Sequence, residues 1–119
     1  MQLQTPQFDE APRSAEPVLS IRCSFVGGIY LIALYGELDV ATAPEVEREL
    51  LRAEATDAEQ IVLDLSALHF MDSTAVKLLL DADARSRADG SRLAMLRAAP
   101  DVQQVLEMSG VSGRLPFLG

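Results

Sequence analysis

From residue 18 onward, the sequence alternates between short apolar runs and amphipathic segments. Two strands are predicted at 18–26 and 29–35, with Gly27-Gly28 as a tight turn between them. The second run, IYLIALY, is apolar almost throughout, which predicts burial on both faces and a central place in a sheet. Shorter runs predict further strands at 61–65 and 92–97, and a short fifth strand at 115–118.

Between these runs, apolar residues recur at the intervals of amphipathic helices. The first helix starts near Thr42, which has capping-box spacing to Glu45, and its core stripe is Val46, Leu50 and Ala53. The second helix starts at the polar trio 72–74 and ends at Gly90, and the third runs from Pro100 to Gly110. The expected inward positions of these two helices are Val76, Leu79, Leu80 and Ala84, then Val102, Val105, Leu106 and Met108. The positions expected to face solvent are Glu45, Glu47, Arg48, Glu49, Arg52, Glu54, Asp81, Asp83 and Asp89.

The order β-β-α-β-α-β-α-β predicts an α/β domain. A mixed sheet would open with the hairpin and continue through right-handed β-α-β crossovers, with helices packed against it. Residues 1–17 are polar and interrupted by prolines, which predicts a disordered tail before a single domain at 18–119.

Charge and composition narrow the classes of function. The 119 residues carry 18 acidic and 10 basic side chains, a net charge of −8, which disfavours nucleic acid and direct contact with anionic membranes. The one cysteine, Cys23, excludes an internal disulfide, and we expect a cytoplasmic protein. No Gly-rich phosphate loop or cysteine pair occurs and there is one histidine, so we expect no cofactor and no metal site.

Two clusters of polar residues are candidates for chemistry. The residue types of a nucleophilic triad occur at Asp64, His69 and Ser73. No G-x-S-x-G pattern surrounds Ser73, so catalysis is disfavoured. Asp72, Ser73 and Thr74 lie where a helix begins, and each could cap it. A phosphate on Ser73 would also be tolerated there, because a helix N-terminus attracts negative charge.

Four segments together carry a family resemblance over residues 18 to 117. They are Gly36-Glu37-Leu38-Asp39, Ile61-Val62-Leu63-Asp64-Leu65, Phe70-Met71-Asp72-Ser73-Thr74 and Met108-Ser109-Gly110-Val111. In this order and spacing the chain resembles the STAS domains, and specifically the stand-alone anti-sigma factor antagonists of bacteria. The resemblance implies a non-enzymatic partner switch that regulates sigma-factor-dependent transcription. An alternative is a STAS adaptor in a stress-sensing or transporter-associated complex, without regulated phosphorylation.

The resemblance also implies residue roles. Ser73 would be phosphorylated by an anti-sigma factor that is also a serine kinase, the phosphorylated form would dissociate, and a serine phosphatase would reset it. The implied partner-binding residues are Asp39, Asp72, Ser73, Thr74 and Lys77. Ala75 stands where the family usually has glycine, and its methyl group is expected to restrict the close approach of a kinase.

Overall fold

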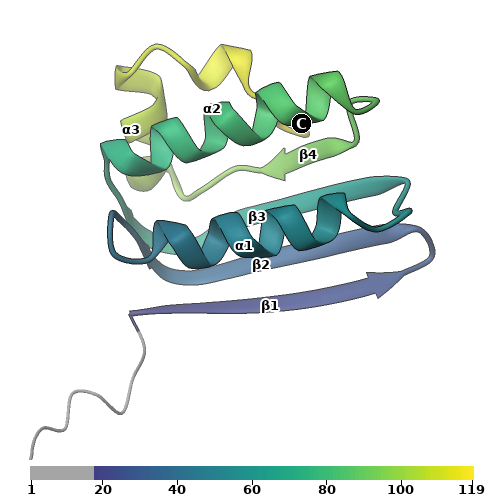
Figure 1. Cartoon of the computed structure of the whole chain (residues 1–119). Coiled ribbons are helices and arrows are strands. Elements are labelled where there is room, and N and C mark those ends of the chain that lie inside the picture. The colour runs from purple at the N-terminus through teal and green to yellow at the C-terminus, as the bar shows by residue number, and fades with distance from the viewer. Residues whose placement is uncertain (1–17) are drawn as a thin grey trace, which may run out of the picture.

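The computed structural model describes residues 18–119 as one α/β domain with four strands and three helices (Figure 1). The predicted tail at 1–17 lies outside the described residues. The strands are β1 (Leu19–Val26), β2 (Ile29–Leu38), β3 (Gln60–Met71) and β4 (Leu93–Leu96). The helices are α1 (Ala43–Glu54), α2 (Ser73–Ala88) and α3 (Pro100–Met108), followed by a 3₁₀ turn at Ser112–Arg114.

The sheet is mixed and has the order β1-β2-β3-β4. β1 pairs antiparallel with β2, while β2, β3 and β4 run parallel, as the predicted hairpin and crossovers require. The central place of β2 is confirmed, but burial on both faces holds only in its middle. Ile29 and Tyr35 on its outer face are 44% and 42% exposed, because no helix covers them there.

Two predicted strands differ most from the structure, and β2 also runs three residues past its predicted end, to Leu38. The fifth strand is only an isolated bridge between Met95 and Phe117, since Pro116 offers a carbonyl but no N–H for a longer ladder. β3 continues to Met71, beyond the predicted end at residue 65, and takes in His69. This extension pairs Leu38 with Met71, so β2 and β3 end side by side.

The core lies between the sheet and the helices. Figure 1 shows α1 crossing in front of β2 and β3, with α2 on the β4 side. The predicted core residues of α1 are buried. The buried side of α2 is rotated relative to the predicted one, because Ala84 is exposed and Asp83 is buried. The Asp83 carboxylate pairs with Arg87 at 3.0 Å. In α3, Met108 is 80% exposed and Gln103 is buried instead, where its Oε1 accepts a hydrogen bond from the Ala98 N–H.

Gly36 fixes the end of the hairpin. Its φ is +116°, and a Cβ atom there would lie 2.2 Å from the Val18 carbonyl oxygen. The register of β2 against β3 shifts directly after it, between Gly36 and Glu37. A glycine is therefore required for β1 to approach β2 closely just before the chain reaches Asp39.

Candidate functional site

The candidate site lies where β2 and β3 end. The backbone N–H of Asp72 donates to the Leu38 carbonyl at 3.3 Å, which joins the two strand ends. Asp39 follows β2 and Asp72 follows β3, and each leads into a helix. The topology therefore brings the Asp39 loop and the start of α2 to one edge of the sheet.

The Asp39 loop is held by its own side chains. The Asp39 Oδ1 accepts hydrogen bonds from the N–H groups of Ala41 and Thr42 at 2.9 and 3.1 Å. The Thr42 hydroxyl donates to the Glu37 carbonyl at 2.9 Å and accepts from the Asp39 N–H at 2.9 Å. The predicted capping box between Thr42 and Glu45 is wrong, because the buried Thr42 side chain is used within the loop and caps no helical N–H.

Asp72 is the N-cap of α2. Its backbone is extended, and its Oδ1 accepts a 2.9 Å hydrogen bond from the Thr74 N–H. Ser73 is the first helical residue and is exposed, so the cap is provided by its neighbour and not by its own hydroxyl. The Ala75 side chain is completely buried in the core. Its methyl group therefore points away from the surface at Ser73, contrary to the expected obstruction.

A groove of about 250 Å³ separates the first turns of α1 and α2. Its floor is mainly apolar and its rim carries charges. The lining residues are Val40, Ala43, Pro44, Glu47, Thr74, Lys77, Leu78 and Asp81. Thr74 and Lys77 therefore face the same groove as Val40 of the Asp39 loop. Val40, Pro44 and Leu78 could not be selected as site residues from the sequence, because the groove forms only where two helices distant in sequence pack together.

Lys77 is exposed on this rim. Its Nζ lies 2.8 Å from the Asp81 Oδ2, and this hydrogen bond raises the pKa of Lys77. The two side chains are one turn apart on α2, with 79% and 51% of their surfaces exposed. Such a pair contributes little to folding, so the Lys77 ammonium group is part of the accessible surface at the groove rim.

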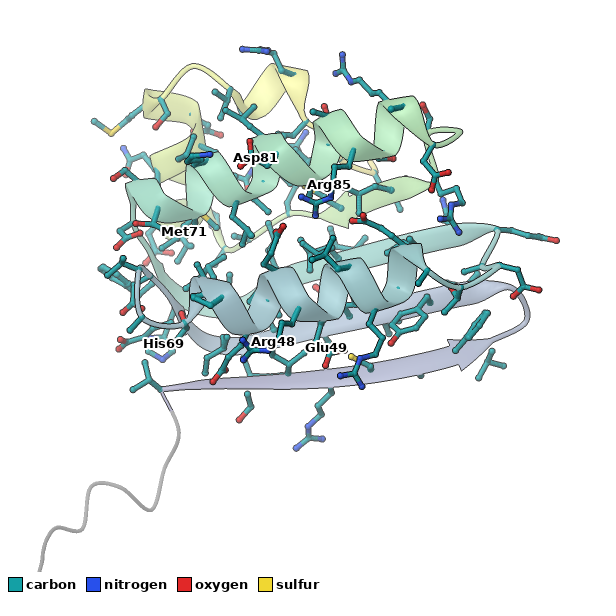
Figure 2. The ribbon with its side chains drawn as sticks, viewed as in Figure 1. Arg48, Glu49, His69, Met71, Asp81 and Arg85 are labelled. Atoms are coloured by element: carbon teal, nitrogen blue, oxygen red, sulfur yellow. The ribbon has the colours of Figure 1, made fainter. Side chains whose placement is uncertain are left out.

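Two arginines hold α1 and α2 in position around the groove. Arg85 of α2 lies between Glu47 and Glu54 of α1, at 2.9 and 3.0 Å, and Figure 2 shows it projecting toward α1. Glu47 and Glu54, predicted to be solvated, are instead half-buried in these ion pairs because α2 packs over them.

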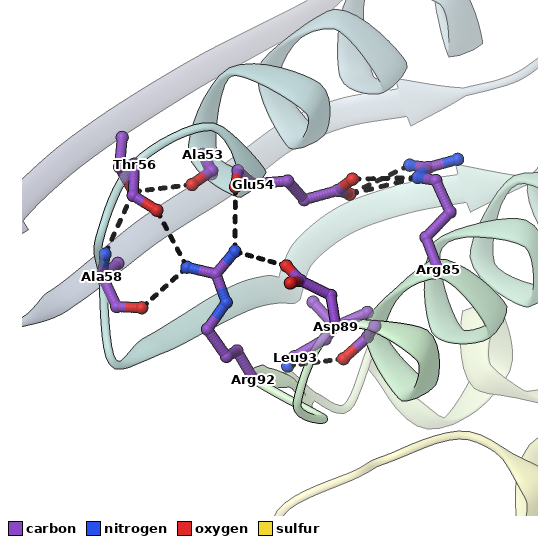
Figure 3. A network of polar contacts seen from close by, with 9 residues as sticks. Ala53, Glu54, Thr56, Ala58, Arg85, Asp89, Arg92 and Leu93 are labelled. Carbon is purple, nitrogen blue, oxygen red and sulfur yellow. Dashed lines mark hydrogen bonds and ion pairs between the residues drawn. The ribbon is translucent and has the colours of Figure 1, made fainter.

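Arg92 closes the other end of α1. It donates to the carbonyls of Glu54, Thr56 and Ala58 at 2.8, 3.0 and 2.8 Å, and it pairs with Asp89 at 2.6 Å (Figure 3). These carbonyls lie in the last turn of α1 and the loop after it, where backbone acceptors lack helical partners. This role could not be predicted from the sequence, because the three carbonyls lie more than thirty residues before Arg92 along the chain.

The triad that the sequence disfavours is also not assembled in the structure. Asp64 and His69 lie on one extended strand, about 16 Å apart at the usual rise per residue, so they cannot form one triad with Ser73. Asp64 instead accepts from the Ser66 N–H at 2.9 Å. Within residues 18–119, no cluster of acidic, histidine and cysteine side chains is suited to a metal ion, and no helix has the length and apolar character for crossing a membrane.

Residues 20–117 match the STAS domain family, and the chain belongs to it. It is 31% identical over 100 residues to an anti-sigma F factor antagonist of Paenibacillus polymyxa, covering 83% of this chain and 86% of that protein. The fold is similar to an anti-sigma factor antagonist from Mycobacterium paratuberculosis, with a TM-score of 0.73 at 21% identity, over 83% and 84% of the two chains.

The fold is also similar to SpoIIAA, an anti-sigma factor antagonist solved in two states. The unphosphorylated form has a TM-score of 0.69 at 25% identity, covering 83% of this chain and 86% of that one. The phosphorylated form from Bacillus has a TM-score of 0.63 at 25% identity, covering 83% and 89%. The described fold is therefore shared with a protein known in both phosphorylation states.

Proposed function

We propose that this STAS domain is an anti-sigma factor antagonist that works by partner switching. In its unphosphorylated form it binds an anti-sigma factor that is also a serine kinase, and phosphorylation of Ser73 releases it. A serine phosphatase resets the cycle, which takes place in the cytoplasm. The main support is the exposed Ser73 directly after the Asp72 cap, in a chain similar to the antagonist of Paenibacillus polymyxa and to SpoIIAA.

A phosphate on Ser73 would leave the fold intact. The cap is the Asp72 carboxylate, so modification of the Ser73 hydroxyl does not remove the hydrogen bond to Thr74. A phosphate would add about 1.5–2 negative charges at a helix N-terminus, which favours them. The modification is therefore expected to change the surface without unfolding α2.

The same phosphate would strongly change the binding surface. It would stand beside Asp72 and at the edge of the groove that Thr74 and Lys77 line. A partner packed there would have to desolvate a dianion next to a carboxylate, which weakens binding unless a cation faces both groups. The proposed partner surface thus consists of Asp39, Asp72, Ser73, Thr74 and Lys77, with the apolar groove floor between them.

Phosphorylation tests this proposal directly. The wild-type protein, bound to beads with Mg-ADP, should retain a small serine-kinase-type ATPase from lysate of the native host. Adding Mg-ATP should then place one phosphate on Ser73, identified by peptide mass spectrometry, and Ser73→Ala should stay unmodified. Phosphate found on Thr74 while Ser73 stays bare would overturn the assignment of the site.

The second candidate is a STAS adaptor that stays in one complex. It is favoured by the same exposed groove, because a groove can bind a fixed partner without any modification. The two functions differ in one observable: an adaptor retains its partner whether or not Ser73 carries a negative charge.

A further inference from the structure

β1 is an edge strand of the sheet. The Glu37 N–H donates to the Val18 carbonyl at 2.9 Å, so these two residues form a hydrogen-bonded pair. Bonded and non-bonded pairs alternate in an antiparallel ladder, so every second residue of β1 from Val18 onward is bonded to β2. The residues between them direct their N–H and C=O groups to the free edge, and they are Leu19, Ile21, Cys23 and Phe25.

The free edge has few of the features that keep edge strands apart. Short length, bulges, prolines and lysines usually protect such edges. β1 has eight residues, pairs with β2 without a bulge, and contains no proline or lysine. Apolar side chains near its hairpin end are also exposed, with Phe25 at 45% and Val26 at 75%. In the described part of the chain, no element pairs with this edge.

We propose that β1 pairs antiparallel with β1 of a second copy, about a two-fold axis at Cys23. In an antiparallel pair, two residues that face each other must both direct their N–H and C=O groups toward the shared edge or both direct them away from it. Because these directions alternate along β1, the two-fold axis must pass through a residue and not between two residues. Arg22 and Cys23 lie at the middle of β1 and give the longest overlap. An axis at Arg22 would place two guanidinium groups opposite each other, which is unfavourable, so the axis falls at Cys23.

The side chains match in this register. Cys23 faces Cys23 of the second copy, and Ile21 faces Phe25 of the second copy. The second pair would bury apolar side-chain surface that is exposed in the single chain, on the side of the sheet that the helices cover. On the other side, Arg22 faces Ser24. The helix nearest this edge is α1, where the Cys23 thiol donates to the Glu49 carboxylate at 3.4 Å, and Figure 2 shows Arg48 and Glu49 on that helix.

Directed disulfides test the register in the full chain. In a Cys23→Ser background, a mixture of the Ile21→Cys and Phe25→Cys proteins should form a disulfide under mild oxidation. These positions should be opposite each other at about 5.5 Å between Cα atoms, within disulfide range. Each single-cysteine protein alone should crosslink little, because its own copies of that residue would be about 13 Å apart along the strands. Equal crosslinking in the mixture and in the separate proteins would overturn the register.

Sedimentation velocity tests the association itself. The wild type should shift from monomer to dimer as its concentration rises, and added salt should favour the dimer because each chain carries a net charge of −8. Cys23→Pro removes only N–H groups that point outward and should raise the dimer dissociation constant about tenfold through two lost hydrogen bonds. Cys23→Ser, which keeps the N–H, should dimerise like the wild type. A wild type that stays monomeric at its highest soluble concentration would overturn the proposal.

The dimer and the partner switch are independent. β1 lies on the far side of β2 from β3, whereas Ser73 follows β3. Cys23→Pro should therefore be phosphorylated on Ser73 like the wild type. A loss of dimerisation with normal phosphorylation separates a failure of this inference from a failure of the proposed function.

Discussion

The Asp72 Oδ1 accepts a 2.9 Å hydrogen bond from the Thr74 N–H, across the exposed Ser73 that lies between them. The helix start is therefore capped by a residue other than the proposed phosphoacceptor. This division separates the stability of α2 from the chemical state of Ser73.

Replacing the cap should lower stability without changing Ser73, the proposed phosphoacceptor. Asp72→Ala leaves the Thr74 N–H without its acceptor and should reduce the free energy of unfolding by about 1 kcal/mol. Asp72→Asn is the matched control, because asparagine caps as well as aspartate and should keep most of that stability. Urea denaturation measures both, and equal losses in the two variants would show that charge and not capping is responsible.

Gly36 should be the least replaceable glycine of the domain's hairpin. Gly36→Ala forces a Cβ atom to 2.2 Å from the Val18 carbonyl oxygen at a φ of +116°, so unfolding free energy should fall by more than about 2 kcal/mol. Gly27→Ala is the control, since its φ of +62° is strained but its Cβ would meet open space. It should cost about 1 kcal/mol. Similar losses at both positions would contradict the close approach of β1 to β2.

Arg92 should stabilise the end of α1 through its planar guanidinium group. Arg92→Ala leaves the carbonyls of Glu54, Thr56 and Ala58 without this donor and should lower the unfolding free energy by about 2–3 kcal/mol. Arg92→Lys keeps the charge but cannot reach all three carbonyls at once, so it should recover less than half of the loss. Full recovery by lysine in thermal or urea unfolding would mean that the charge alone matters.

The Cys23 thiol should react slowly. Partial burial, the hydrogen bond to Glu49 and the charge of Glu49 raise the pKa of Cys23 from 9.0 to about 11. At pH 8 the folded protein should therefore be alkylated roughly a hundredfold more slowly than the urea-unfolded chain, because only the thiolate reacts. Glu49→Gln removes the charge and should increase the rate in the folded protein.

The same pKa sets the sign of a pH effect. The folded state favours the neutral Cys23 thiol. The contribution of this thiol to the free energy of unfolding is therefore full below pH 9 and is lost as the pH rises toward 11. Cys23→Ser should remove this part of the alkaline loss. Equal alkylation rates in the folded and unfolded chains would contradict the raised pKa.

Regular patterns in the sequence were sufficient to predict most of the fold. The alternation in 18–26 and the Gly27-Gly28 turn predicted the β1–β2 hairpin, because each follows from local backbone preference. The stripe of Val46, Leu50 and Ala53 predicted the buried side of α1. Errors occurred where tertiary contacts decide the outcome. Asp83 is buried through its pair with Arg87, and Met108 is exposed because α3 turns Gln103 inward instead.

The candidate site was only partly accessible from the sequence. Asp39, Asp72, Ser73, Thr74 and Lys77 could be selected from motifs, and the roles assigned to them remain predictions. The groove could not be predicted, because Val40 and Leu78 come together only when α1 and α2 pack. Arg85 was missed for the same reason, since its partners Glu47 and Glu54 lie on another helix.

The most direct test of the account is a comparison of partner retention by three immobilised proteins. Wild type, Ser73→Glu and Ser66→Glu would be incubated with native-host lysate and Mg-ADP, and the serine-kinase-type partner quantified by mass spectrometry. Ser66 is also exposed but lies within β3, so it controls for added charge alone. We predict that wild type and Ser66→Glu retain the partner and that Ser73→Glu loses it. Equal retention by all three would contradict the switch and favour a fixed adaptor.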